Sequence, residues 1–302
     1  MDTKHLVVVK SNKVVEAGYR LSLYEQRILL SCIAQINSKG SLTIEDRFEV
    51  SAKEIVELSG VISLDRVYSI LKEAVDKLSL RKVIICDPDP NNPKEKTRSI
   101  SWISSVGYMP NEGKVLLRFG FDMIPYLTIL TKEFTQYKLE NVTKFKSTYS
   151  IRLYELLMQW ISTGKREVEI AWLKKQLQVE ESYPQMCDFK KRVIDVAIKE
   201  INDHSDIHVN KPDQRKAGRV ITHFIFTFGF KPPKASKTPS KNTVRTKPLI
   251  PLFEGHPNYV VDTAVVLADH EVLKVKPISK SKIIDDVTKQ KIAGLKKATK
   301  AK

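Results

Sequence analysis

The chain has 302 residues, with 51 lysines and arginines against 35 aspartates and glutamates, and a formal net charge of +16. Apolar residues make up 42% of it, enough for a hydrophobic core, and the length suggests two domains. No run approaches the roughly 18 apolar residues of a membrane-spanning helix, and the start lacks the apolar stretch and cleavage site of a secretory signal. We therefore expect a cytoplasmic protein with no membrane partner.

The positive charge is concentrated at the end of the chain. From Lys231 onward there are 16 lysines and arginines against 6 acidic residues. Because this stretch begins with a segment rich in Lys, Pro, Ser and Thr, we predict a largely disordered basic tail over 231–302. The charge favours a polyanionic partner, either nucleic acid or an anionic surface, without establishing one.

Residues that carry catalytic or metal chemistry are sparse. Cys32, Cys86 and Cys187 are odd in number and far apart, which indicates a reducing compartment and argues against disulfides and structural zinc. The close pair His204 and His208 lies where a strand begins, which argues against a metal site. The chain has no P-loop, no G-x-S-x-G or H-E-x-x-H motif and no acidic cluster at two-metal spacing. We expect a protein without a cofactor that is not an enzyme.

The first half of the chain shows one supersecondary order. A capping box of Ser22 and Glu25 opens a helix over 21–36, and a second, of Ser51 and Glu54, opens one over 51–60 after a short strand. Ser63 caps a longer helix that runs to Leu78. The three strand-like runs that follow are 82–86, 100–109 and 115–121, joined by the charged loop 87–99 and the turn 110–114. This order is typical of a winged helix whose wing has the long loop 87–99.

The same order recurs about 120 to 126 residues later. The elements are helix 147–161, strand 166–170, helix 171–179, turn 180–186, helix 188–202, and strands 207–211 and 220–230 around the basic loop 212–219. The predicted fold class is therefore α+β, with two tandem winged-helix (helix-turn-helix variant) domains. The predicted boundaries are 1–131 for the first domain, 132–147 for a linker, 148–230 for the second domain and 231–302 for the tail.

The helix predicted over 188–202 has two chemically different faces at about 100° per residue. The apolar arc holds Phe189, Val193, Ile194, Val196, Ala197, Ile198 and Ile201. The opposite arc holds Lys191, Arg192, Asp195, Lys199 and Asn202, which sum to +2, whereas Lys190 lies in the apolar arc with its ammonium at the helix start. The corresponding face in the first domain (Asp65, Arg66, Ser69, Lys72, Glu73 and Asp76) sums to −1. We therefore expect the second domain to be the main reader of a DNA duplex, the alternative being a merely solvated helix face.

Individual roles follow from the chemistry of the side chains. The predicted base-reading set, from the helix start and the preceding turn, is Lys191, Arg192, Asp195, Ser182, Tyr183 and Gln185. The predicted backbone contacts in the second domain are Lys199, Arg215, Lys216 and Arg219, and Lys190 and Asn202 complete its surface. Auxiliary contacts are expected from Arg66, Ser69, Lys72, Lys94, Lys96 and Arg98 in the first domain. Asp195 has an equal alternative as an ion-pair partner of Lys191 or Lys199.

Other residues have structural interpretations. Arg152 is expected to tie its helix to a domain, and Trp160 and Trp172 to lie in the core. The apolar strand 223–230 could pair with another chain from a sheet edge, but packing on its own domain is the commoner outcome.

Two stretches, 134–160 and 177–202, resemble the signature segments of the initiator (Rep) proteins of theta-replicating plasmids with iterons, short direct repeats at the origin. The resemblance covers roughly residues 5 to 230. It departs from the family at Val196, where many members have proline; valine keeps the amide donor and should remove a kink. The tail lies outside the resemblance.

The resemblance implies a protein that binds origin repeats as a monomer, opens the origin and recruits the host initiator and helicase. It also implies a homodimer, formed through the first domain, that represses its own promoter. The alternatives are a winged-helix transcriptional regulator without replication activity and a scaffold protein whose winged helices bind proteins.

Overall fold

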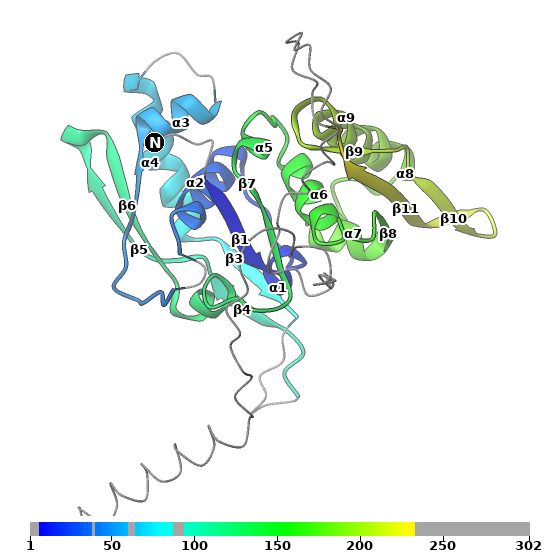
Figure 1. Cartoon of the computed structure of the whole chain (residues 1–302), viewed down its shortest axis with the longest axis horizontal. Helices are drawn as coiled ribbons and strands as arrows, with labels where there is room; N and C mark the ends of the chain where they lie inside the picture. Colours follow the sequence, from blue (N-terminus) through cyan, green and yellow to red (C-terminus); the bar gives the residue numbers. More distant parts are fainter. Residues whose placement is uncertain (1–5, 38–39, 60–63, 87–93, 233–302) are drawn as a thin grey trace, which may run out of the picture. The chain divides into compact units, whose positions relative to one another are not determined.

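The computed structural model describes residues 6–37, 40–59, 64–86 and 94–232. They form two tandem winged-helix domains, as predicted (Figure 1). From residue 233 onward the predicted tail lies outside the described residues. Across the described ranges, no helix combines the length and apolar character needed to cross a membrane.

The first domain follows the predicted order of helices and strands, with additions at its start and end. Its helices and strands are β1 (Val7–Ser11), α1 (Asn12–Val15), α2 (Leu23–Ala34), β2 (Phe48–Ser51), α3 (Ala52–Ser59), α4 (Leu64–Ser79), β3 (Lys82–Ile85), β4 (Arg98–Ser101), β5 (Ile103–Met109), β6 (Lys114–Phe119) and β7 (Phe134–Lys138). Two 3₁₀ turns, η2 (Pro110–Glu112) and η3 (Phe121–Tyr126), and the short helix α5 (Glu140–Thr143) complete it.

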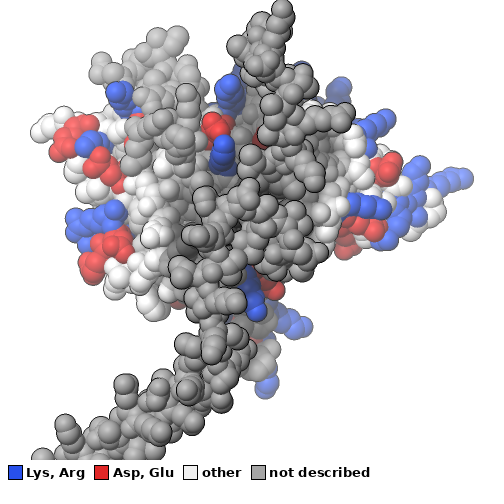
Figure 2. All heavy atoms as spheres, viewed as in Figure 1, with Lys and Arg blue, Asp and Glu red and all other residues white. Residues whose placement is uncertain are grey.

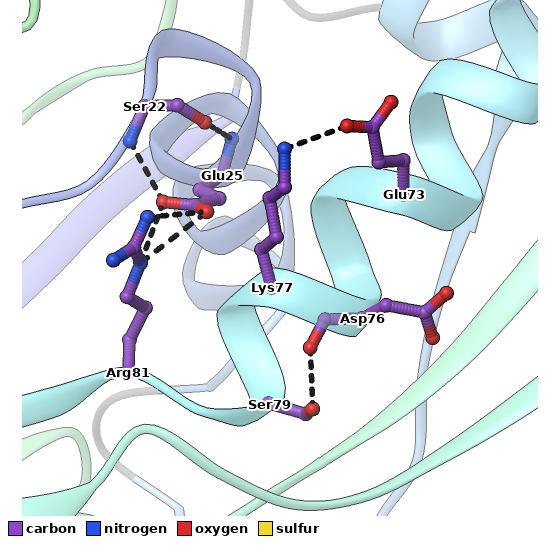
Figure 3. A network of polar contacts seen from close by, with 7 residues as sticks. All are labelled: Ser22, Glu25, Glu73, Asp76, Lys77, Ser79 and Arg81. Carbon is purple, nitrogen blue, oxygen red and sulfur yellow. Dashed lines mark hydrogen bonds and ion pairs between the residues drawn. The ribbon is translucent and has the colours of Figure 1, made fainter.

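Both predicted capping boxes are present. The Ser22 hydroxyl accepts a hydrogen bond from the Glu25 amide at 3.3 Å, and the Glu25 carboxylate accepts one from the Ser22 amide at 2.7 Å (Figure 3). Ser51 and Glu54 make the same reciprocal pair at 3.1 Å. The Arg81 guanidinium also donates to the buried Glu25 carboxylate, so this cap joins the start of α2 to the end of α4. Capping chemistry therefore fixes where both helices begin.

The wing of the first domain is not the hairpin predicted from the sequence. The sheet order is β2-β6-β5, so the hairpin that extends the winged-helix sheet is β5–β6, with its turn at Pro110–Glu112. Strands β3 and β4 pair with each other in a separate ladder, to which Gly18 adds an isolated bridge at Ile84. The run predicted over 100–109 is divided between β4 and β5. Lys94, Lys96 and Arg98 thus belong to an additional hairpin, of which residues 87–93 lie outside the described residues.

The second domain repeats the same layout with a more basic hairpin. Its elements are α6 (Thr148–Met158), β8 (Lys165–Glu169), α7 (Ile170–Gln176), α8 (Met186–Phe189), the π-helical turn η4 (Lys190–Ile194), α9 (Asp195–His204), β9 (Ile207–Val209), β10 (Asp213–Ala217) and β11 (Val220–Phe230).

Strand β11 is the centre of the second sheet. It pairs with β10 on one side and β8 on the other, and its last residues pair with β9 (Figure 1). Its Phe224, Phe226 and Phe228 are buried. The outcome expected as the commoner one for 223–230, packing on its own domain, is therefore confirmed, and this strand is not at the edge of its sheet. Most of the predicted loop 212–219 is instead the strand β10.

The predicted linker 132–147 is folded onto the first domain. It contains β7, which pairs in antiparallel register with β1, and the helix α5. The Arg27 side chain on α2 donates to the carbonyl oxygens of Thr143 and Phe145 at 3.2 and 3.0 Å. This segment is therefore part of the packed structure, because its backbone is paired at both ends.

A buried charge cluster joins the N-terminal strand to α6. The Lys10 ammonium donates to Glu155, and both side chains are fully buried. The Tyr137 hydroxyl on β7 donates to the same carboxylate at 2.5 Å. Arg152 pairs with Glu155 at 3.5 Å, lies over the ring of Tyr19 at 3.8 Å and hydrogen-bonds to its hydroxyl. Its guanidinium also donates to the Ala17 carbonyl at 2.7 Å, so Arg152 has the predicted tying role.

The titration of this cluster is governed by burial and by its opposite charges. Burial alone would raise the pKa of Glu155, but Lys10 and Arg152 together outweigh it and hold that pKa below its usual value. Burial lowers the pKa of Lys10, and the attraction of Glu155 compensates for this only in part. The Glu155 carboxylate is thus ionised because the positive charges of Lys10 and Arg152 stabilise its charged form.

Two tryptophans flank another buried arginine. The Arg166 guanidinium lies 5.8 Å from the ring of Trp160 and 5.4 Å from that of Trp172, and it bonds to Glu16 at 2.7 Å. Trp160 is 42% exposed, so the prediction that it is a core residue is wrong, whereas Trp172 is partly buried and packs against the core. Their rings shield a cation from solvent.

We predict that Glu155→Gln lowers the free energy of unfolding by about 3–5 kcal/mol, because Lys10 would remain buried without a counter-charge. Urea denaturation of the full chain measures the loss. Adding Lys10→Met to Glu155→Gln should restore part of it. The control is Glu112→Gln, which removes a surface pair with Lys114 and should leave the midpoint nearly unchanged. Equal effects of Glu155→Gln and Glu112→Gln would contradict a buried pair.

The depressed pKa of Glu155 also fixes the sign of a pH effect. Its stabilisation is present above the unfolded pKa of about 4.3 and is lost as the pH falls through the lower folded value. The unfolding midpoint of the wild-type chain should therefore fall more steeply on acidification than that of Glu155→Gln. Parallel pH profiles would show that Glu155 does not supply this acid sensitivity.

Candidate nucleic-acid interface

The predicted reading helix of the second domain is not one regular α-helix. It begins as α8, widens into the π-helical turn η4 and continues as α9. The amide of Asp195 donates to the carbonyl of Lys190, five residues earlier, which is the hydrogen bond of a π turn. A π turn accommodates one more residue than an α turn, so the faces that follow are displaced by about 100°, the angle of one residue.

This displacement changes which side chains face outward. Val196, predicted at one edge of the apolar arc, is 38% exposed, whereas Val193, Ala197 and Ile201 remain fully buried. Asn202, predicted on the outer face, is half-buried, and its amide group donates to the Val209 carbonyl at 2.9 Å and accepts from the Val209 amide at 2.7 Å. Both hydrogen-bonding functions of Asn202 are thus used within the fold, and its expected place on the outer face is wrong.

The π turn also determines the partner of Asp195. The Lys190 ammonium lies 2.7 Å from both carboxylate oxygens of Asp195, five residues further on. An α-helix brings together residues three or four apart, so the ion pairs considered from the sequence were with Lys191 and Lys199. The widened turn selects Lys190 instead. This pair draws Lys190 out of the predicted apolar arc and fixes Asp195 beside it.

Three exposed cations occupy the outer face of this helix. Within the described residues, Lys191 and Lys199 form no ion pair. Arg192, with its side chain 68% exposed, lies 3.5 Å from Asp188, a surface pair that contributes little. The buried residues Phe189, Val193, Ile194, Ala197 and Ile201 hold the opposite side of the helix in the core. The predicted combination of a cationic outer face and an apolar inner face is therefore present.

The turn before the helix presents two of its three predicted residues to solvent. Ser182 and Gln185 are exposed, and Gln185 occupies the N-cap position of α8. Tyr183 is half-buried, with its ring edge-on to that of Tyr149 at 6.3 Å. The Lys174 ammonium of α7 bonds to the Tyr183 carbonyl at 2.6 Å and so holds the turn against the preceding helix.

The hairpin β10–β11 forms a basic wing beside the reading helix. All residues of β10 are exposed, and a tight turn at Gly218, with φ of 60°, connects it to β11. Figure 2 shows Lys and Arg atoms gathered over this hairpin, at the right of the view. Arg215 is anchored to Glu167 of β8 at 2.7 Å and contacts His223, whereas Lys216 and Arg219 form no ion pair within the described part of the chain.

The corresponding surfaces of the first domain are more neutral. On α4, Lys77 pairs with Glu73 at 2.6 Å (Figure 3). Lys72 lies 5.4 Å from the ring of Tyr108, whose hydroxyl bonds to Asp76. Ser69 is exposed, and the side chain of Arg66 lies outside the described residues.

Acidic neighbours also neutralise the hairpins of the first domain. In the wing β5–β6, Lys114 pairs with Glu49 and Glu112 at 2.8 and 3.1 Å, and Arg118 pairs with Glu45 at 3.2 Å. In the additional hairpin, Arg98 lies 3.4 Å from Glu95, while Lys94 and Lys96 are exposed. These charges are consistent with the predicted difference between the domains, in which the second carries the stronger cationic surface.

The family comparisons match both domains. Residues 7–158 match the family described as initiator replication protein, WH1, and residues 169–228 match initiator Rep protein, WH2. A replication initiation protein of Escherichia coli is 28% identical over 228 residues, covering 73% of this chain and 69% of the relative. The PI protein of Escherichia coli is 27% identical over 240 residues, covering 69% of this chain and 78% of the relative.

A solved structure shares the arrangement over most of the chain. It is the crystal structure of a Pi initiator protein in complex with iteron DNA, and it matches with a TM-score of 0.65 and 25% sequence identity. The match covers 76% of this chain and 98% of that chain.

We predict that Asn202→Ala lowers the free energy of unfolding by about 1–3 kcal/mol, because it leaves the buried amide and carbonyl of Val209 without their partner. The measurement is urea denaturation of the full chain. Asp203→Ala is the matched control, since the neighbouring side chain is exposed and its removal should change stability little. If Asn202→Ala were as stable as Asp203→Ala, the corner between α9 and β9 would not depend on this amide.

Proposed function

The chain belongs to the family of initiator Rep proteins with WH1 and WH2 domains, and from this premise we propose that it binds the direct repeats (iterons) of a plasmid origin. The observation that carries the proposal is the second domain's cationic surface, made of Lys191, Arg192 and Lys199 on the reading helix and Lys216 and Arg219 on the wing. A helix braced by a buried face and flanked by a basic hairpin fits the major groove and the adjacent phosphates. The likeness to an initiator bound to iteron DNA supports the same use of this surface.

The two domains divide the work in this proposal. The second domain reads bases through Lys191 and Arg192, because residues near the start of a recognition helix reach base edges. Lys199 and the wing contact the sugar-phosphate backbone. The first domain, whose cations are largely paired with acids, makes auxiliary contacts through Lys72 and the hairpin β3–β4. Asp195 is held by Lys190 and is assigned no base.

Further steps of initiation belong to the same proposal. We assign to this chain opening of the origin, recruitment of the host initiator and helicase, and repression of its own promoter as a homodimer formed through the first domain. Membership of the initiator family supports these assignments. The protein acts in the cytoplasm, by binding rather than by enzymatic catalysis. The cysteines Cys32, Cys86 and Cys187, none of which is in a disulfide, suit a reducing compartment.

The test of DNA binding starts from a pool of random duplexes, since the repeat sequence is unknown. The full chain should enrich one sequence, and a labelled duplex carrying it in direct repeats should shift at lower protein concentration than a scrambled duplex. A chain that enriches no sequence, or that binds both duplexes equally, would overturn sequence-specific binding. A plasmid with the gene and its flanking DNA then separates an initiator from a transcriptional regulator, because only an initiator sustains replication.

We predict that Arg192→Ala costs about 1–3 kcal/mol of binding to the enriched duplex, and much less with scrambled DNA, because it removes a base contact. Gel-shift titrations with both duplexes measure the ratio of affinities. Lys199→Ala, on the same face, is the matched variant and should lower the affinity for both duplexes by the same factor. An unchanged ratio for Arg192→Ala would remove it from the reading set.

We predict that Lys216→Ala weakens binding to all duplexes and reduces the slope of log affinity against log salt by about one unit, because one phosphate contact is lost. Arg215→Ala should behave similarly, with the added loss of its pair with Glu167. The control is Lys138→Ala, which removes the same charge from β7, outside the proposed surface. A sequence-selective loss with Lys216→Ala would make this residue a reader of bases instead.

A further inference from the structure

An apolar side chain lies in the middle of the cationic face of the reading helix. Val196 is 38% exposed, although it is the second residue of α9 in the helix that supplies much of the domain core. It precedes Lys199 by three residues within α9, a spacing that places helical side chains on one face. The Val196 side chain is therefore part of the surface that is proposed to face DNA.

The π turn is the cause of this exposure. In an uninterrupted α-helix Val196 would lie on the same side as Val193 and Ala197, both fully buried. The wider turn over Lys190–Ile194 displaces Val196 by about one residue position, away from the core. The Lys190–Asp195 pair and the Lys190–Asp195 backbone hydrogen bond both close this turn, so the outward direction of Val196 is built into the fold.

The side chains around Val196 define the chemistry that it meets. Arg192 and Lys199 suit guanine edges or phosphates, and the Asp195 carboxylate is engaged by Lys190. Val196 offers two methyl groups and no hydrogen-bonding group. In the major groove, the apolar feature of a base pair is the C5 methyl group of thymine, which small apolar side chains contact.

Building on the proposed DNA binding, we propose that Val196 is a specificity-determining residue that contacts a thymine methyl group within the repeat. The contact selects thymine at one position, next to the base pair read by Arg192. It buries a methyl group on each side of the interface, and the loss of one such group weakens binding about fourfold.

The test removes the apolar contact from each partner separately: the two γ-methyl groups of Val196 on the protein, and the C5 methyl group of thymine on the DNA. The full chain is used to enrich a duplex from a random pool, and each thymine of that duplex is then replaced in turn by deoxyuridine, which lacks only the C5 methyl. At one position the replacement should weaken wild-type binding about fourfold. Val196→Ala should bind the thymine duplex as weakly as wild type binds that deoxyuridine duplex, and should lose nothing more when the methyl group is removed. A pool enriched by Val196→Ala should accept cytosine as well as thymine there.

Ile44→Ala is the control, since Ile44 is also an exposed apolar residue, at 50%, but lies between α2 and β2 of the first domain, outside the proposed DNA contacts. It should keep the wild-type response to every deoxyuridine. Thermal unfolding of Val196→Ala should match wild type, which excludes a loss through misfolding. The proposal is overturned if wild type and Val196→Ala respond alike to every deoxyuridine substitution. A chain that enriches no sequence at all overturns the proposed function instead, so the two failures are distinguishable.

Discussion

The buried carboxylate of Glu155 is the interaction on which the arrangement of this chain depends. A charge with no solvent contact is tolerated only when opposite charges and donors surround it, and Lys10, Arg152 and Tyr137 supply them. Lys10 lies on β1, Tyr137 on β7, and Arg152 and Glu155 on α6. Because the Glu155 charge needs partners from all three elements, it holds β1, β7 and α6 together. Helix α6 in turn packs on α9 and on the π turn, so the buried network stabilises the helix against which the reading helix packs. A feature far from the proposed DNA contacts therefore supports them.

The features that could be predicted from the sequence are those with local causes. Capping boxes at Ser22 and Ser51 depend on residues three positions apart, and both are formed. The π turn has no such signature. Residues 193–198 include five apolar side chains, so the apolar arc is wide enough to fit either an α-helix or a helix shifted by one residue. The misassignment of Val196 and Asn202 follows from this ambiguity, because a continuous α-helix was the simpler interpretation.

Long-range strand pairing accounts for the other differences between the predicted and the observed structure. The runs that become β3 and β4 are adjacent in the sequence and form a hairpin, but the winged-helix sheet is completed when β2 pairs with β6, more than 60 residues away. The residues of β6 do not indicate that β2, rather than another strand, is its partner. Likewise the segment 132–147 reads as a polar connection until β1 is available to pair with β7. Trp160 was expected in the core, yet its exposed ring lies over the buried Arg166 guanidinium.

The two domains differ in charge pairing more than in layout. In the first domain, acids on neighbouring elements neutralise the wing cations, as Glu49 does for Lys114 and Glu45 for Arg118. A phosphate group would have to compete with these carboxylates for the cations, and would also be repelled by them. On the second wing only Arg215 has an acidic partner, while the tip and the reading helix keep cations without one within the described residues. Counterion release then favours the second domain, since each cation that meets a phosphate there gives up only water and salt. Duplicated architecture thus carries unequal cationic surfaces through the placement of a few acidic side chains.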